Sequence, residues 1–339
     1  MTAIADLPIC RADFTAIRFY SIPMNVRFRN ITVREGVLLQ GPAGWGEFCA
    51  FDDYDDRESV SWLRTALEAA FQGWPALIRD SIPVNSIIPA VGPEEAYRRA
   101  REDRCTTAKI KVADHADSLV EDVARVEAVR DALGPNGQLR IDVNGKWDVD
   151  TALKCIPILD KAASGLQYVE QPCATIEELA KVRKHIDVPV AADESIRRAN
   201  DPLKVAVAGA ADIAIIKCTP LGGVRRALSI ADAAGLPAVI SSAVETSIGL
   251  GAQVALAAAI PKLPYACGFG TNALLSGDLV SSEHALTPRD GTIDVHPVGL
   301  IPDPKLLDQW VMTDPQRRQW WSDRLDRVLA LHNAHSTTE

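Results

Sequence analysis

Three carboxylates stand at the ends of short apolar runs in the middle of the sequence: Asp142 in RIDVNG, Glu170 in YVEQP and Asp193 in VAADES. They are 28 and 23 residues apart, counting from 142 to 170 and from 170 to 193. That spacing is about one strand and helix of a parallel α/β fold, so the three carboxyls are expected on neighbouring strand ends. Hard oxygen ligands favour an octahedral ion over Zn2+, which predicts a Mg2+ site in which Mn2+ can substitute.

Three lysines flank these carboxylates. Lys109 and Lys111 are two residues apart in AKIKV, so their side chains share one face of a strand. Lys217 ends the run IAIIK one further unit along the chain. A metal ion between Lys111 and Lys217 suits the removal of a proton next to a carboxylate, because the ion stabilises the enediolate that forms. A lysine held near other cations has a lowered pKa and can act as the base at neutral pH.

The alternative for each of these six residues is one half of a structural ion pair. For any one of them taken alone, that interpretation is the better one. Six charged groups in register at consecutive strand ends cost too much desolvation to be framework, so the complete set favours catalysis. Two neighbours are assigned differently: Asn144 is expected to hydrogen-bond around the metal, and Glu194 to pair with a lysine of a helix.

The elements that must position these residues follow one rhythm from about residue 84 onward. Short apolar runs rich in Val and Ile alternate with amphipathic stretches of helical period. Eight strands with seven intervening helices predict an α/β fold of the (β/α)8 type, a modified TIM barrel with functional residues at the carboxyl ends of its strands. The eight runs begin near residues 84, 107, 139, 166, 188, 212, 236 and 265.

The two ends of the chain differ from this repeat. Residues 1–82 contain alternating strand-like segments and the amphipathic stretch SVSWLRTALEAAF, which predict an α+β capping domain. The C-terminal segment 285–339 contains the helical pattern PQRRQWWSDRLDRVLALHN and is assigned to complete that domain. The catalytic barrel is then expected over residues 83–284.

Composition excludes several classes of function. The 339 residues carry a formal net charge of −9, which repels phosphate backbones and anionic lipids. No apolar run reaches the roughly 20 residues that span a bilayer, and the first residues lack a signal-peptide pattern. Seven scattered cysteines suggest neither a disulfide framework nor a zinc site. We expect a monomeric cytoplasmic enzyme with a small carboxylate substrate and without nucleic-acid or membrane partners.

Longer motifs surround the candidate residues and extend over almost the whole chain. They are MNVRFRNITVREGVLLQGPAGWGEFCAF, AKIKV, RIDVNGKW, YVEQPCAT, PVAADESI, IAIIKCTPLGG, VISSAVETSIGL, ACGFGT and RRQWW. In these motifs the sequence resembles the muconate-lactonising subgroup of the enolase superfamily and, within it, the o-succinylbenzoate synthases of actinobacterial type. The resemblance implies a Mg2+-dependent lyase. Its reaction would be β-elimination of water from 2-succinyl-6-hydroxy-2,4-cyclohexadiene-1-carboxylate, giving o-succinylbenzoate for menaquinone biosynthesis.

The resemblance also implies a role for each lysine. Lys111 would abstract the proton next to the carboxylate and then return a proton to the departing hydroxide. Lys217 would stabilise the enediolate from the opposite face. Lys109 would help to hold the substrate carboxylate and lower the pKa of Lys111.

In the family that the sequence resembles, the first domain caps the mouth of the barrel. The loops around Asn25 to Asn30 and Trp45 to Asp53 are therefore expected to close over the substrate and exclude water. GPAGWGEF fits equally well a tight turn with Trp45 in the core. The residues expected to contact substrate are Arg27, Trp45, Asn144, Ser241, Ser242 and Gly268.

Two alternatives stay open at this point. An N-succinylamino acid racemase, a dipeptide epimerase or a muconate cycloisomerase of the same superfamily would share the metal site and differ in cap and pocket. The racemase needs both lysines as bases, and both are present. The second alternative is a barrel that only binds a ligand, which the intact set of lysines and carboxylates disfavours.

Overall fold

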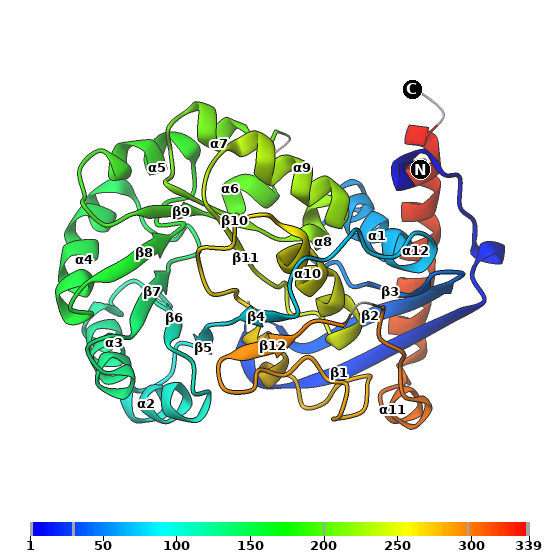
Figure 1. The fold of residues 1–339 in the computed structure, drawn as a ribbon, viewed down its shortest axis with the longest axis horizontal. Coiled ribbons are helices and arrows are strands. Elements are labelled where there is room, and N and C mark those ends of the chain that lie inside the picture. Colours follow the sequence, from blue (N-terminus) through cyan, green and yellow to red (C-terminus); the bar gives the residue numbers. More distant parts are fainter. Residues whose placement is uncertain (1–2, 29–30, 199–200, 297, 337–339) are drawn as a thin grey trace.

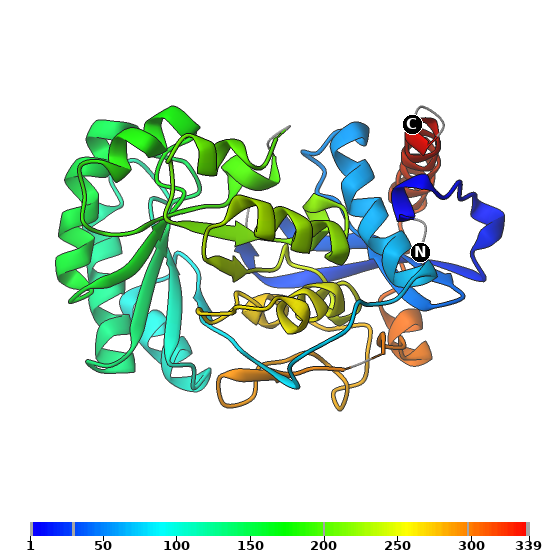
Figure 2. The ribbon, with the colours of Figure 1, turned by 45° about the horizontal axis from the view of Figure 1, so that its top comes forward.

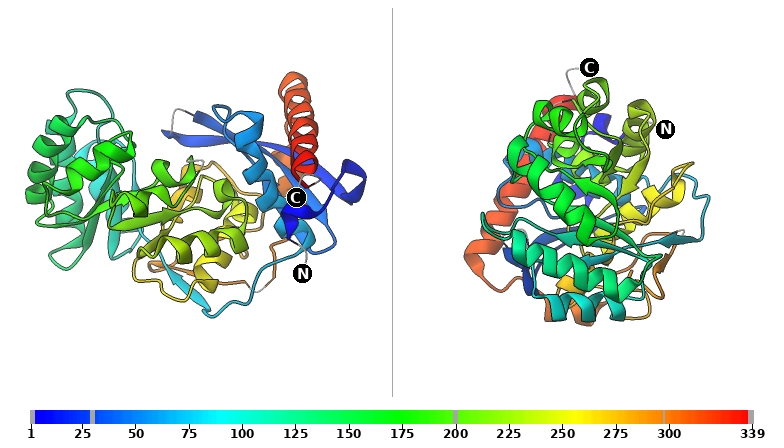
Figure 3. Two further views of the ribbon diagram at one scale, coloured as in Figure 1. Left: turned by 90° about the horizontal axis from the view of Figure 1, so that it is seen from above. Right: turned by 90° about the vertical axis from the view of Figure 1, so that its left-hand side faces the viewer.

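The computed structural model describes residues 3–28, 31–198, 201–296 and 298–336, and it has two parts. A barrel of strands and helices forms the middle of the chain, and a smaller domain lies to one side of it (Figures 1 and 3). Among the described residues, no helix is long and apolar enough to cross a membrane. The cysteines carry free thiols, and only Cys10 among the seven is exposed.

The first domain is built on an antiparallel sheet of β1 (Ala16–Phe28), β2 (Ile31–Gly41) and β3 (Gly44–Phe48). The helix α1 (Asp56–Phe71) covers this sheet and starts with a capping box between Asp55 and Glu58. Gly46 permits the close approach, because a Cβ at this position would lie 2.0 Å from the Ala66 carbonyl oxygen.

The C-terminal helix α12 (Pro315–Ser336) also belongs to this domain. Its apolar residues Trp321, Leu325 and Val328 join one buried cluster with residues of β2 and α1. Figure 2 shows α1 between α12 and the barrel, where α1 packs against the short helix α8 (Cys218–Leu221). The proposed domain boundaries at residues 82 and 285 remain predictions.

The barrel contains a parallel sheet in the order β11-β10-β9-β8-β7-β6-β5. Parallel bridges from Val84 to Cys267 and from Ser241 to Gly268 join its two edges through an eighth segment. The predicted α/β barrel with a capping domain is therefore confirmed, although the eighth run forms only bridges. The strands are β5 (Ser86–Ile88), β6 (Thr107–Lys111), β7 (Gln138–Asp142), β8 (Leu166–Glu170), β9 (Val190–Ala192), β10 (Ile213–Ile216) and β11 (Ala238–Ile240).

Helices surround the strands of the barrel (Figure 1). Gly134 and Gly235 follow two of them with positive φ, which ends a helix without steric strain. The helices are α2 (Pro93–Glu102), α3 (Leu119–Leu133), α4 (Val149–Ala162), α5 (Ile176–Arg183), α6 (Glu194–Arg197), α7 (Lys204–Val207), α9 (Val224–Ala234) and α10 (Ser247–Ala259).

The remaining elements are short. The strand β4 (Ser81–Pro83) pairs antiparallel with β12 (Thr292–Asp294). The other short elements are η1 (Ile4–Asp6), η2 (Arg11–Asp13), η3 (Gly270–Leu274) and α11 (Pro304–Gln309).

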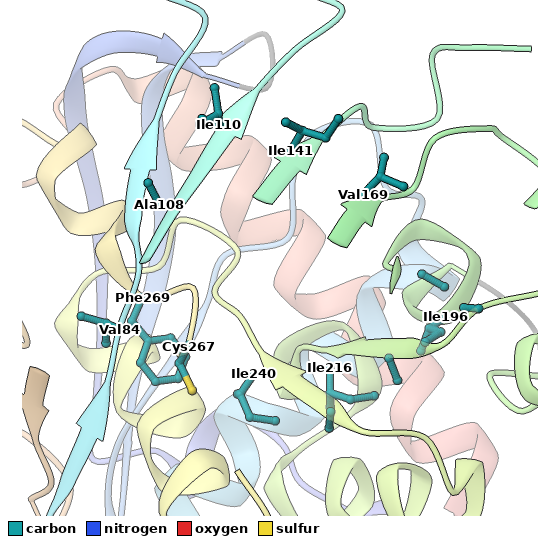
Figure 4. Packing of buried hydrophobic residues seen from close by; sticks show 14 of the residues in the cluster. Val84, Ala108, Ile110, Ile141, Val169, Ile196, Ile216, Ile240, Cys267 and Phe269 are labelled. Carbon is teal, nitrogen blue, oxygen red and sulfur yellow. The ribbon is translucent and has the colours of Figure 1, made fainter. Parts of the chain in front are cut away.

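Alternation along the strands separates the packed core from the site. Ala108 and Ile110 of β6 belong to the large cluster between strands and helices (Figure 4). Because successive side chains of a strand point to opposite faces, Lys109 and Lys111 face the barrel interior. Deeper in that interior, Tyr168 packs with apolar residues of β9 to β11 in a separate small cluster.

The structure corrects the two expected cap loops. Residues 25–28 continue β1, which reaches Phe28 after an irregularity in its pairing with β2, and positions 29 and 30 lie outside the described residues. Trp45 likewise belongs to a strand, because it pairs with Gln40 of β2. Strand structure therefore replaces the expected loop at residues 25–28 and 45–48, whereas residues 49–53 lie outside any helix or strand, as expected for a loop.

Candidate active site

The six predicted charged residues lie together at the carboxyl ends of β6 to β10. Lys111, Asp142 and Glu170 are the last residues of β6, β7 and β8, while Asp193 and Lys217 directly follow β9 and β10. Figure 1 shows these strands side by side in one curved sheet. The regular βα spacing of these residues in the sequence therefore brings them close together in space.

Short ion pairs connect the two kinds of charge. The Lys109 ammonium lies 2.9 Å from Glu170 Oε1 and 3.3 Å from Asp142 Oδ2. The Lys111 and Lys217 ammonium groups each lie 2.5 Å from a carboxylate oxygen, of Asp142 and Asp193 respectively. Lys111 and Lys217 thus stand at the two ends of the row of carboxylates.

Burial and neighbouring charges shift the ionisation of this cluster. Burial, together with the nearby Asp142 and Asp193 carboxylates, raises the pKa of Glu170 to about 7. Burial also acts to raise the pKa of Asp142, but the Lys111 and Lys109 ammonium groups hold that pKa below its usual range. Burial lowers the pKa of Lys217.

The donor set fits a divalent cation. In the part of the chain that the structure describes, no three Asp, Glu, His or Cys side chains converge on one point, and the Lys109 ammonium lies between Glu170 and Asp142. Three buried carboxylates on neighbouring strand ends offer the hard oxygen ligands that such ions prefer. A cation bound there would face carboxylates that in this structure pair with the three lysines and Arg197.

Asn144 and Gln171 orient the charged groups. The Asn144 side-chain oxygen accepts a hydrogen bond of 2.7 Å from Lys111, and its backbone N–H donates to Asp142. The Gln171 side chain accepts from the Asp193 N–H and donates to the Ser195 hydroxyl. Both amides therefore fix strand ends that carry ionisable groups.

The structure corrects the expected partner of Glu194, because this carboxylate pairs with an arginine instead of a lysine. Arg197 of α6 donates to Glu194 over 2.6 Å and to Asp193 over 3.1 Å. It also donates to the Tyr54 hydroxyl, which belongs to the first domain. Asp193 and Arg197 are four residues apart at the start of a helix, and that spacing could have predicted the ion pair between them.

A second contact that the sequence did not predict is an aromatic ring over a candidate base. The Lys111 ammonium lies 5.2 Å from the centre of the Phe28 ring, at the end of β1. The end of β1 thus reaches the barrel mouth. Strand patterns alone carry no signal for this contact, since it depends on how the two domains pack.

The predicted substrate-contacting residues fall into two groups. Ser241, Ser242 and Gly268 lie together at the closure of the barrel, where the Ser242 hydroxyl donates to the Gly268 carbonyl over 2.7 Å. A Cβ on Gly268 would lie 2.6 Å from the Ser241 hydroxyl oxygen, so a larger residue there would displace that hydroxyl. Arg27 is exposed next to Phe28, whereas Trp45 packs against the core of the first domain. Substrate contact stays a prediction for all five.

Comparison with known proteins gives the same family from both halves of the chain. Residues 19–70 match the family described as enolase N-terminal domain-like, and residues 93–300 match enolase C-terminal domain-like. Relatives named o-succinylbenzoate synthase come from Thermobifida fusca, Mycolicibacterium smegmatis and Mycobacterium tuberculosis. The first is 58% identical, over 92% of this chain and 96% of its own length. The second is 49% identical, over 92% of this chain and 94% of its own length. The third is 44% identical, over 97% of this chain and 98% of its own length.

Solved structures share the fold at lower identity. An L-Ala-D/L-Glu epimerase from Bacillus subtilis has a TM-score of 0.71 at 22% identity, over 85% of this chain and 97% of its own. The muconate lactonizing enzyme from Pseudomonas putida has a TM-score of 0.71 at 18% identity, over 88% of this chain and 99% of its own. These two likenesses extend to the fold alone. By its profiles and its curated relatives, the chain belongs to the enolase superfamily and, within it, to the o-succinylbenzoate synthase family.

Proposed function

We propose that this chain is a hydro-lyase that removes water from 2-succinyl-6-hydroxy-2,4-cyclohexadiene-1-carboxylate to give o-succinylbenzoate for menaquinone biosynthesis. The relatives of that name, 44–58% identical over almost the whole chain, support the substrate. The observation that carries the reaction type is the pair Lys111 and Lys217 at opposite ends of a row of buried carboxylates.

Enzymes of this superfamily typically use a divalent metal ion, which Asp142, Glu170 and Asp193 would hold in this chain. Bound there, the ion supplies electrostatic stabilisation for negative charge on the substrate carboxylate. Three carboxylates without a thiolate or imidazole favour Mg2+, for which Mn2+ can substitute. These residues lie at the rim where barrels of this type bind their substrates.

Lys111 is assigned as the base and then the acid. As the free amine it takes the proton from the carbon next to the carboxylate. The electron pair of the broken C–H bond forms the new double bond, and the C–O bond breaks. The protonated Lys111 then gives its proton to the leaving hydroxide, so that water departs and the ring becomes aromatic. Asn144, which contacts the Lys111 ammonium over 2.7 Å, orients it for both transfers.

Lys217 is assigned as a positive charge on the opposite side of the substrate. It stabilises the negative charge that develops when the proton leaves, and it does not need to exchange protons itself. Lys109, held between Glu170 and Asp142, helps to hold the substrate carboxylate. This unequal division of roles separates dehydration from racemisation.

The first domain is assigned as the cap that excludes water. Phe28 already lies over Lys111, and Tyr54 contacts Arg197 beside Asp193. Substrate contacts are expected from Asn144, Ser241, Ser242, Gly268, Arg27 and Trp45. The cytoplasmic location and the monomeric state remain predictions.

A second candidate is racemisation of N-succinylamino acids, which the placement of a lysine at each end of the carboxylate row also favours. The test is steady-state turnover of the purified protein with Mg2+ on the cyclohexadiene substrate and on a panel of N-succinylamino acids. Dehydration that exceeds every racemisation rate is expected. Fast racemisation with little dehydration would overturn the proposed reaction and keep the superfamily. Inactivity on all substrates would favour a barrel that only binds a ligand.

A further inference from the structure

A segment of the barrel inserts into the core of the first domain. Ala243, Val244 and Ile248, which follow β11, belong to the same buried cluster as residues of β2 and α1. Val244 has a φ of 63°, a left-handed conformation that a β-branched residue adopts only under strain. Strained backbone of this kind persists when surrounding contacts over-determine it. The contacts around Val244 therefore need an explanation.

Arg34 of β2 supplies the first of these contacts. Its Nε donates to the Val244 carbonyl over 2.8 Å, and a terminal nitrogen donates to the Ala243 carbonyl over 3.3 Å. The guanidinium is buried and lies 4.4 Å from the centre of the Phe51 ring. A buried cation that donates to two consecutive carbonyls fixes the direction of that backbone, since the guanidinium is planar and rigid.

Glu47 of β3 supplies the second contact. Its carboxylate accepts from the Thr246 N–H over 3.2 Å and from the Gly249 N–H over 2.8 Å. It also accepts from the hydroxyls of Thr246 and Tyr20, each over 2.5 Å. These N–H groups lie at the start of α10. Backbone N–H groups there have no carbonyl partner within the helix. A residue of the first domain thus caps a helix of the barrel.

The barrel holds the same segment from the other side. Glu245 accepts from the Ala243 N–H over 2.5 Å and from the Thr219 hydroxyl over 2.6 Å. Gln253 of α10 donates to the same carboxylate over 2.9 Å. Both domains therefore hydrogen-bond to the segment between Ala243 and Thr246. Its strained turn comes directly after Ser241 and Ser242.

We propose that Arg34 and Glu47 are positioning residues for the substrate. They hold residues 243–246 in the strained conformation and thereby set the position of Ser241 and Ser242 at the barrel mouth. This inference rests on the proposed function, which assigns those serines to the substrate pocket. The first domain then shapes the pocket wall through the barrel's own backbone, in addition to covering the mouth with its hairpin.

The test is Arg34→Met, which keeps the length and burial of the side chain and removes the donors to the two carbonyls. Without them the turn relaxes, so KM for the cyclohexadiene substrate is expected to rise about tenfold while kcat changes less than about threefold. Amide exchange at residues 241–249 is expected to become faster in the same variant.

Arg79→Met is the matched control. Arg79 also donates to several carbonyls, those of Ala257 and Ala258 in α10 and of Ile260 just after it, but at the end of the helix remote from the strained turn. A purely structural role of Arg34 would make the two variants alike, with lower unfolding midpoints and unchanged KM. That result would overturn the proposal, whereas a raised KM in Arg34→Met together with an unchanged KM in Arg79→Met would support it.

Glu47→Gln tests the second contact independently of Arg34. The amide keeps the shape but places an NH2 group against N–H donors, so the same rise in KM is expected, with unchanged affinity for Mn2+. If Arg34→Met does not fold, Glu47→Gln alone decides between raised and unchanged KM. Wild-type protein that does not turn over the substrate would contradict the proposed function. Amide exchange at residues 241–249 would then still decide whether Arg34 and Glu47 hold the segment.

Discussion

Two buried polar clusters hold charge in different ways. In the strand-end cluster, which comprises the three lysines and three carboxylates at the ends of β6 to β10, each charge pairs with another side-chain charge. In the domain joint, which comprises Arg34, Glu47, Glu245 and the segment 243–249, the charges pair mainly with backbone groups and hydroxyls. Both clusters are buried, except for Lys111, which is partly exposed at the barrel mouth.

This difference suits the strand-end cluster to catalysis and the domain joint to holding one conformation. An ammonium that neutralises a carboxylate can be replaced there by another cation, so the strand-end cluster can exchange partners when a metal or substrate arrives. A backbone carbonyl or N–H has a fixed position and direction, so the domain joint specifies one conformation. Substitutions in the first cluster should therefore change rates, and those in the second should change stability and substrate affinity.

The largest expected effect comes from Lys111→Ala. Loss of the base should lower dehydration by about 1000-fold or more and abolish exchange of the substrate α-proton with solvent deuterium. Turnover and exchange measured on the same preparation check both parts. Lys154→Ala, an exposed lysine of α4, is the control and should behave like wild type. Near-normal exchange in Lys111→Ala would assign the proton transfer to another group.

In Lys217→Ala the dehydration rate should fall by roughly 100- to 1000-fold, which is the typical loss for one electrostatic contact in the transition state. Substrate should still bind, because the carboxylates and Lys109 remain. Lys217→Arg keeps the charge but misplaces it, since the guanidinium is larger and planar, and should recover only part of the rate. Equal and complete loss of proton exchange in both Lys111→Ala and Lys217→Ala would favour the racemase chemistry.

Glu170→Gln should weaken Mn2+ binding by more than the roughly 10- to 100-fold that loss of an outer-shell partner costs. Calorimetric titration of the protein measures that affinity directly. Mg2+ should raise the unfolding temperature of wild type but not that of the variant. An anomalous peak of soaked Mn2+ away from Asp142, Glu170 and Asp193 would contradict this site.

Glu47→Gln, unlike Glu170→Gln, should affect stability and not metal binding. It should lower the free energy of unfolding by about 1–3 kcal/mol, because buried donors of α10 lose their acceptor. Urea unfolding without metal measures this loss. The effect should not depend on Mg2+. A stability equal to wild type would mean that the start of α10 finds other acceptors and that the joint is less rigid than its contacts suggest.

The sequence predicted the strand-end cluster because both of its determinants are local. Alternation along a strand placed Lys109 and Lys111 on one face, and the repeat length of the βα unit placed Asp142 and Glu170 next to each other. Neither step requires knowledge of how distant segments pack.

The domain joint was not predicted, for the converse reason. Arg34 lies 210 residues from Val244 along the chain, and the apolar run around it gives no sign that its partners are carbonyls. The contact of Phe28 with Lys111 depends on the same packing of two domains. GPAGWGEF left two interpretations open, and the structure agrees with the tight turn, because the motif pairs with β2 along most of its length and Trp45 packs against the core.

The smallest expected effect concerns this contact of the hairpin with the barrel. Phe28→Leu keeps an apolar cover but removes the ring that lies 5.2 Å from the Lys111 ammonium. A cation–π contact is worth about 0.5–1 kcal/mol at partly exposed sites, so kcat should change about two- to fivefold, while Phe28→Tyr should stay within twofold of wild type. Phe19→Leu is a matched control, since Phe19 lies on the same strand 5.7 Å from the Arg318 guanidinium. Equal kcat in Phe28→Leu, Phe28→Tyr and Phe19→Leu would mean that the hairpin only covers the mouth and leaves the base electrostatically untouched.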